Sequence, residues 1–152
     1  MEEALGEIIA SMNGEDRIWY TLYDSESGGG SNTGFDDFGV LRAVNLQGYP
    51  ENRDGLMEVL SISISVAPES NDVLEARIMF VPERMARAYV SDEDDMSELV
   101  LIEELELEEE GGFITGTFAA ELCFKDGMFA NPDPEDCIVL EGRFHTELVR
   151  NG

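Results

Sequence analysis

Apolar and polar residues alternate strictly along residues 59–66, which read VLSISISV. Side chains that alternate with a period of two lie on opposite sides of a β-strand. One side of this strand is therefore apolar and the other is lined with serine, as expected for a half-buried strand of an antiparallel sheet. The apolar set is Leu60, Ile62, Ile64 and Val66.

Similar alternation occurs in the segments RIWYTLYD, FGVLRAVNLQG, LEARIMFV and RAYV. In SELVLIEELELEEE the apolar parity changes between Ile102 and Leu105, and a β-bulge near Glu103 and Glu104 would restore it. A helix is the alternative for this segment, because Glu and Leu are good helix formers. The following Gly-Gly pair and the strand-rich surroundings favour a strand.

Turn-forming sequences separate these short runs, among them Asn13-Gly14, SGGGSNTG, APESND and NPDPED. Regularly spaced short strands predict an all-β fold, namely an antiparallel β-sandwich or a partly open barrel with a C-terminal hairpin. The 152 residues are expected to form a single domain, 1–152, with residues 1–5 as a flexible tail. The N-terminal stretch also fits one face of a helix, but we favour a strand leading into an Asn-Gly hairpin.

Acidic residues dominate the charge: 34 Asp and Glu against 9 Lys and Arg give a formal net charge of −25. Such a charge repels nucleic acid, so direct nucleic-acid binding is not expected. Adaptation to salt is a sufficient explanation for this acidity. No apolar run reaches the length of a transmembrane segment, and none is expected.

Both cysteines lie in the C-terminal pair of alternating runs, at Cys123 and Cys137. A hairpin symmetric about the intervening loop pairs residues whose numbers sum to 260, which places the two cysteines opposite each other and Ala119 opposite Glu141. Both cysteines fall on the outer face, so we predict a cross-strand disulfide that closes a loop of about 15 residues. Two unrelated free thiols are the alternative. Zinc is not expected, because two cysteines and a distant single histidine do not supply four ligands.

The segments GGFITGTFAAEL and CIVLEGRFHTEL, with ASMNGEDRIW near the N-terminus, carry a resemblance. They resemble the terminal hairpins of a family of bacterial secreted or lipid-anchored β-sandwich proteins of unknown function, with a Gly-x-Phe pattern on paired strands. The resemblance implies an envelope or secreted β-sandwich, and it supplies no functional residues. The matching positions are Gly116, Phe118, Ile138 or Leu140, Gly142 and Phe144.

No catalytic motif stands out, and we do not expect an enzyme. The single histidine, His145, is predicted to lie on the outer face of a strand with no Ser or Cys placed for it to activate. No cofactor is expected, although calcium has weak candidates in Asp133, Glu135 and Asp136 of the NPDPED loop. A solvated acidic loop is the simpler interpretation. Asp92, Asp94 and Asp95 are equally weak calcium candidates, because an acid-rich sequence produces such runs by composition.

Two aromatic groups are candidates for a binding surface. One is the loop from Gly28 to Asp37 with the adjoining Phe38, where Phe35 and Phe38 are flanked by acidic residues. The other is the cluster of Trp19, Tyr20 and Tyr23, which core packing explains more simply.

Two functional hypotheses follow. The first is a non-catalytic exported or cell-envelope domain that binds a protein or glycan, or serves as a structural module, with its export signal removed. The alternative is a cytoplasmic acidic decoy that occupies the basic groove of a nucleic-acid-binding protein, because distributed carboxylates can imitate phosphates. Oxidised cysteines would favour the first and reduced cysteines the second. The sequence specifies no ligand and no oligomeric state.

Overall fold

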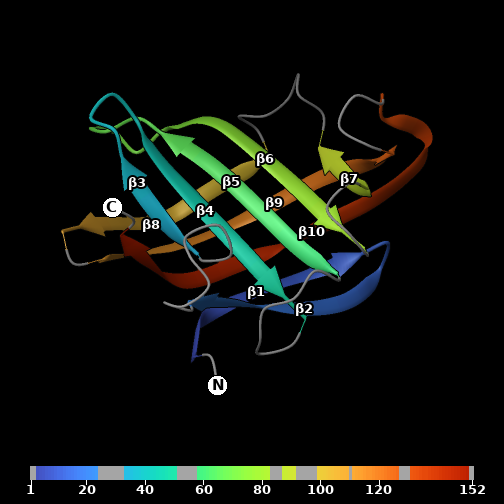
Figure 1. Cartoon of the computed structure of the whole chain (residues 1–152), viewed down its shortest axis with the longest axis horizontal. Coiled ribbons are helices and arrows are strands. Elements are labelled where there is room, and N and C mark those ends of the chain that lie inside the picture. The colour runs from blue at the N-terminus through green and yellow to red at the C-terminus, as the bar shows by residue number, and fades with distance from the viewer. Residues whose placement is uncertain are drawn as a thin grey trace.

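The structure is a computed structural model of the whole chain (Figure 1). It describes residues 3–23, 33–50, 58–82, 87–91, 99–109, 111–126 and 131–150. Every helix or strand assigned within these ranges is a β-strand, so the predicted all-β class is confirmed. The strands are β1 (Glu3–Met12), β2 (Glu15–Tyr23), β3 (Gly34–Asp37), β4 (Arg42–Tyr49), β5 (Val59–Val66), β6 (Val73–Val81), β7 (Arg87–Ser91), β8 (Val100–Glu108), β9 (Gly111–Asp126) and β10 (Asp133–Arg150).

The ten strands form one sheet that curves back on itself. Its order is β2-β1-β10-β3-β4-β5-β6-β7-β9-β8, and β10 also pairs with β9, which closes a ring from β10 through β3 to β7 and β9. All pairings are antiparallel except the short one between β3 and β10. In Figure 1, β4, β5 and β6 cross in front of β9 and β10. The arrangement therefore has the two facing layers of a sandwich and the closure of a barrel.

The core lies between these layers and is built from the inward parity of each strand. In β5, Leu60, Ile62, Ile64 and Val66 are all buried, as the alternation predicts. The largest fully buried side chains come from both layers and are Trp19, Phe35, Phe144, Ile8, Leu46, Leu60, Ile62, Ile64, Ile78, Ile114 and Leu122. Within the described residues, no helix is long and apolar enough to cross a membrane.

The C-terminal hairpin of β9 and β10 has the predicted register. Paired residue numbers sum to 260 from Cys123 opposite Cys137 down to Gly112 opposite Leu148, including Ala119 opposite Glu141. Because the register is regular over this length, inward residues alternate with outward ones along both strands. The register shifts only beyond Cys137, toward Asp133.

Glycine and phenylalanine face each other twice in this hairpin. Phe144 lies opposite Gly116, and Phe118 lies opposite Gly142. The two rings are stacked, with centroids 6.2 Å apart, and a Cβ on Gly116 would lie only 2.8 Å from the Phe144 ring. Packing thus explains both glycines of the Gly-x-Phe pattern: Gly116 leaves room for the Phe144 ring, and Gly142 leaves room for the β1 backbone at Ile9 and Ala10.

The N-terminal hairpin turns at Asn13-Gly14, as predicted. Both residues have positive φ, 51° and 87°, which suits a two-residue hairpin turn. Asn13 is tied to β10, because its backbone N–H donates to the Val139 carbonyl and its side-chain oxygen accepts from the Val139 N–H. The helical alternative for this segment is wrong.

Residues 3–5 of the expected tail instead belong to β1, which begins at Glu3 and pairs there with Tyr23 of β2. Residues 1 and 2 lie outside the described residues. The pairing shifts between Ala4 and Gly6, so a bulge lies there. This bulge changes the parity, which is why simple alternation did not extend the strand to its first residues.

Candidate functional site

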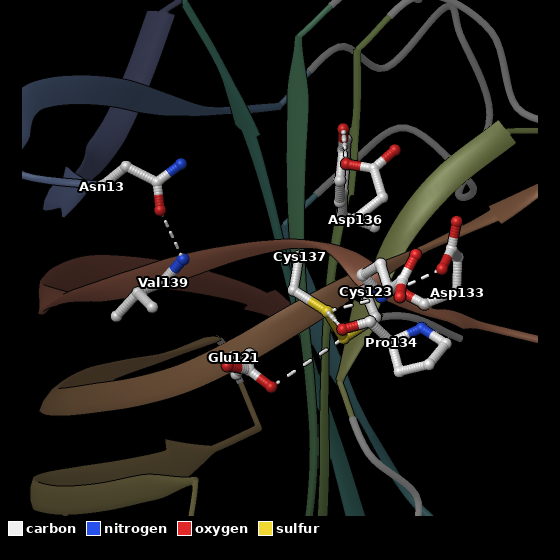
Figure 2. The surroundings of a disulfide bond; sticks show 10 residues. Asn13, Glu121, Cys123, Asp133, Pro134, Asp136, Cys137 and Val139 are labelled. Atoms are coloured by element: carbon white, nitrogen blue, oxygen red, sulfur yellow. Dashed lines mark hydrogen bonds between the residues drawn. A yellow bond between two sulfur atoms is a disulfide. The ribbon is translucent and has the colours of Figure 1, made fainter.

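The loop end of the β9–β10 hairpin carries the disulfide between Cys123 and Cys137 (Figure 2). The two residues are directly opposed in the register, and their Cα atoms lie 4.0 Å apart. Both are partly exposed on the outer face of the sheet. The predicted bridge is therefore present in the structure, and it ties the two longest strands together beside their connection.

Oxygen atoms surround this disulfide (Figure 2). The Glu121 carboxylate lies 4.0 Å from the Cys123 sulfur, and the Asp133 and Pro134 carbonyl oxygens each lie 3.5 Å from the Cys137 sulfur. A disulfide sulfur has no proton to donate, so these contacts are not hydrogen bonds in the oxidised form. The negative charge beside the bridge repels anionic thiol reductants.

Tyr89 of β7 joins the same end of the sheet. Its hydroxyl donates a 3.0 Å hydrogen bond to the Asp136 carboxylate, and its ring packs edge-on against Phe124 at 5.3 Å. Burial raises the pKa of the Tyr89 phenol, and the hydrogen bond and charge of Asp136 raise it further. Tyr89 therefore stays protonated as a donor, and links β7 to the first residues of β10, just before Cys137.

The calcium candidates Asp133, Glu135 and Asp136 lie at the start of β10 and not in a loop as predicted, and their surroundings differ. Asp133 accepts a hydrogen bond from the Glu135 backbone N–H at 2.9 Å, and Asp136 accepts from Tyr89. Among the described residues, the one group of three side chains within ligand distance of each other is Glu121, Cys123 and Cys137. Its two sulfurs are bonded to each other, so it offers one carboxylate rather than a metal centre. Asp133, Glu135 and Asp136 form no such group, and calcium stays a prediction that the geometry does not strengthen.

A shallow depression of about 700 Å³ lies on the outer side of the sheet, across β1, β10, β9 and β8. Ile9, Ala119 and Leu101 supply its apolar part, and Glu141 and Arg143 supply exposed charges. It is open to solvent. A depression of this kind can hold an extended segment or a glycan, but it does not enclose a small molecule as a typical active site does.

His145 is exposed on the outer face of β10, as predicted. In the part of the chain that the structure describes, its ring makes no hydrogen bond with a serine, threonine or cysteine side chain. The geometry therefore offers no activated nucleophile at this histidine.

The aromatic candidates divide between core and surface. Phe35 is 1% exposed in β3 and belongs to the core, because β3 pairs with β4 and β10, so its proposed role in a binding loop is wrong. Phe38 is 62% exposed beyond the end of β3. Residues 28–32 of that loop, and Asp92, Asp94 and Asp95, lie outside the described residues.

Trp19 is fully buried and packs edge-on against Phe80 at 6.3 Å. Its indole N–H donates to the Glu58 carbonyl, and the Glu58 carboxylate forms a 2.8 Å ion pair with Arg17, which lies over the Trp19 ring. Tyr20 is half-buried, and the Tyr23 side chain is outside the described set. Core packing, the simpler explanation, therefore holds for Trp19.

The position of β8 at one end of the described strand order is a feature that alternation does not reveal. β8 ends the strand order, and within the described residues it pairs only with β9. The predicted bulge is confirmed by a register shift between Ile102 and Glu104. The helical alternative for this segment is wrong, because the segment pairs with β9 as a strand. Alternation revealed the strand, but no local signal reveals which strand has a single neighbour.

Comparisons with known proteins find no matching family, no matching curated protein and no matching solved structure.

Proposed function

We propose that this chain is a non-catalytic domain of an extracytoplasmic compartment, where it acts as a binding or structural module. The observation that carries the proposal is the Cys123–Cys137 bridge across the base of the C-terminal hairpin. Disulfides persist in oxidising compartments and are reduced in the cytosol of most cells. A partly exposed bridge of this kind therefore fits a periplasmic, envelope-anchored or secreted protein.

The surface supports a binding role more than a catalytic one. The depression over β1, β10, β9 and β8 is open, with an apolar part and a few exposed charges. Surfaces of this shape suit a protein segment or a glycan. The resemblance to secreted β-sandwich proteins points to the same location, although packing alone accounts for Gly116, Phe118, Gly142 and Phe144.

The alternative is the acidic decoy that inhibits a nucleic-acid-binding protein. The net charge of −25 and the exposed glutamates of β8 favour it. A decoy of this kind works in the cytosol with reduced thiols, and its binding weakens steeply as salt is added.

The redox state of the cysteines in native cells separates these functions. Cells are quenched with acid, the protein is alkylated without reductant, and its intact mass is compared with a sample that is reduced before alkylation. We expect two alkyl groups only after reduction. Two alkyl groups without reduction would overturn the extracytoplasmic proposal and place the decoy first.

A further inference from the structure

We propose that β8 is an open edge that accepts an extended, cationic β-strand from another protein. This inference deepens the proposed binding function and rests on it. Its starting observation is topological: among the described strands, β8 has a neighbour on one side only. Alternate backbone N–H and C=O groups of such a strand point away from the sheet and are open to a further strand.

The second half of β8 is regular enough to pair. After the bulge, Glu104 to Glu108 follow an unbroken register with β9, from Glu104 opposite Thr115 to Glu108 opposite Gly111. Glu104, Glu106 and Glu108 are exposed on the outer face, with a spacing of roughly 7 Å between alternate residues. A strand with Lys or Arg at every second position would place each cation directly opposite one of these carboxylates.

The inner face of the same segment is incompletely covered. Leu105 and Leu107 pack against the core but remain half-buried, whereas Ile114, which lies opposite Leu105 on β9, is fully buried. The apolar side chains of an added strand would lie beside the two leucines and remove their remaining surface from water. The complementary strand therefore alternates basic and apolar residues.

Charge decides between a second copy of this chain and a foreign strand. Pairing two β8 edges with their outer faces aligned places glutamate opposite glutamate, because Glu104, Glu106 and Glu108 all have the same parity. Directly opposed like charges destabilise a strand pair. Charges on an edge strand also protect a sheet from aggregation. The same carboxylates that repel a second copy attract a cationic strand.

The test uses the full oxidised chain and a fluorescein-labelled ten-residue peptide in which Lys and Val alternate. Fluorescence anisotropy at low salt should show saturable binding that weakens as salt is added. A peptide of the same composition with its lysines and valines in two blocks should bind at least about tenfold more weakly, because it cannot match charge on one face and apolar surface on the other. N-methylation of alternate residues on the pairing edge should abolish binding.

Matched variants assign the site. The triple variant E104Q/E106Q/E108Q should weaken binding by about tenfold, whereas E15Q/E69Q/D72N, with the same change of net charge, should leave it within about twofold. Both control and test residues are exposed, so both variants are expected to fold. Equal weakening by the two variants, or equal binding of the block peptide, would show non-specific attraction and overturn the proposal. Absence of binding would overturn it as well. The extracytoplasmic location would then still be decided by the alkylation experiment.

Discussion

The β9–β10 hairpin and the β8 strand are neighbours in the sheet, yet their backbones are held very differently. β9 lies between β10 and two further strands, its register with β10 is regular, and a disulfide closes the hairpin at its loop end. β8 pairs with one described neighbour, carries a bulge and leaves Leu105 and Leu107 half-buried. From this difference we expect the β9–β10 side of the sheet to be more rigid than the β8 edge.

Among the substitutions in the β9–β10 hairpin, Gly142→Ala in β10 should have the largest effect on stability. A Cβ at Gly142 would clash with the Ile9 carbonyl oxygen and would lie 2.6 Å from the Ala10 Cα. These are backbone atoms of β1, so the strand itself would have to move, and we expect a loss of about 3 kcal/mol in the free energy of unfolding. Urea denaturation measures it.

The control for that variant is Leu101→Ala on β8. Leu101 is 68% exposed, so its truncation should change the unfolding free energy by less than about 0.5 kcal/mol. Similar stabilities for the two variants would contradict the contrast between the hairpin and the edge.

Removal of the disulfide should have the next largest effect. The bridge joins residues 14 apart in the sequence, and the double variant Cys123→Ala/Cys137→Ala should lose about 3 kcal/mol or somewhat less. In thermal unfolding, the oxidised protein should have the highest melting temperature and the reduced protein the lowest, with the double variant between them. If reduced and oxidised protein melted together, the bridge would not hold the hairpin.

A matched pair of truncations compares the two strands directly, because Leu105 of β8 lies opposite Ile114 of β9. Ile114 is fully buried, and Ile114→Ala should cost about 2 to 3 kcal/mol. Leu105→Ala should cost about 1 kcal/mol, because its side chain is already partly in water. Equal costs in denaturant titrations would mean that the β8 edge is as well packed as the hairpin.

The smallest effect concerns the link from β7 to the disulfide loop. Tyr89→Phe removes the hydrogen bond to Asp136 and should cost about 0.5 to 1 kcal/mol at neutral pH. The folded protein raises the pKa of Tyr89 above the ordinary value of 10.0 for a tyrosine, so this contribution is present below pH 10 and is lost as pH rises through the folded pKa.

A pH series checks that sign. The stability difference between wild type and Tyr89→Phe should shrink above pH 10. A difference that stayed constant through the alkaline range would show that the hydroxyl is not a donor to Asp136.

Sequence periodicity predicted much of the local structure because its signals are local. Alternation identified β5, the loop symmetry gave the register of β9 and β10, and the parity change located the bulge before Glu104. Ring closure was not predictable in this way. It depends on the pairing of β3 with β10 and of β7 with β9, between segments far apart in the chain.

The candidate site was predicted in part for the same reason. Cys123 and Cys137 face each other through hairpin symmetry, which sequence spacing can reveal. Tyr89 reaches Asp136 from 47 residues away, and only the closure of the sheet brings them together. The glycine-rich run before Phe35 predicts that this residue lies in a flexible loop. In the structure Phe35 lies in β3, which pairs with β4.

Hydrogen exchange followed by mass spectrometry on the free, oxidised chain tests the contrast between the two regions most directly. We predict strong protection of backbone amides in residues 112–123 and 137–148, and much faster exchange in residues 104–108 of β8. Addition of the alternating cationic peptide should slow exchange in β8 and leave the hairpin unchanged. Protection of β8 equal to that of the hairpin in the free chain would contradict the account, because an edge that is already covered has no room for another strand.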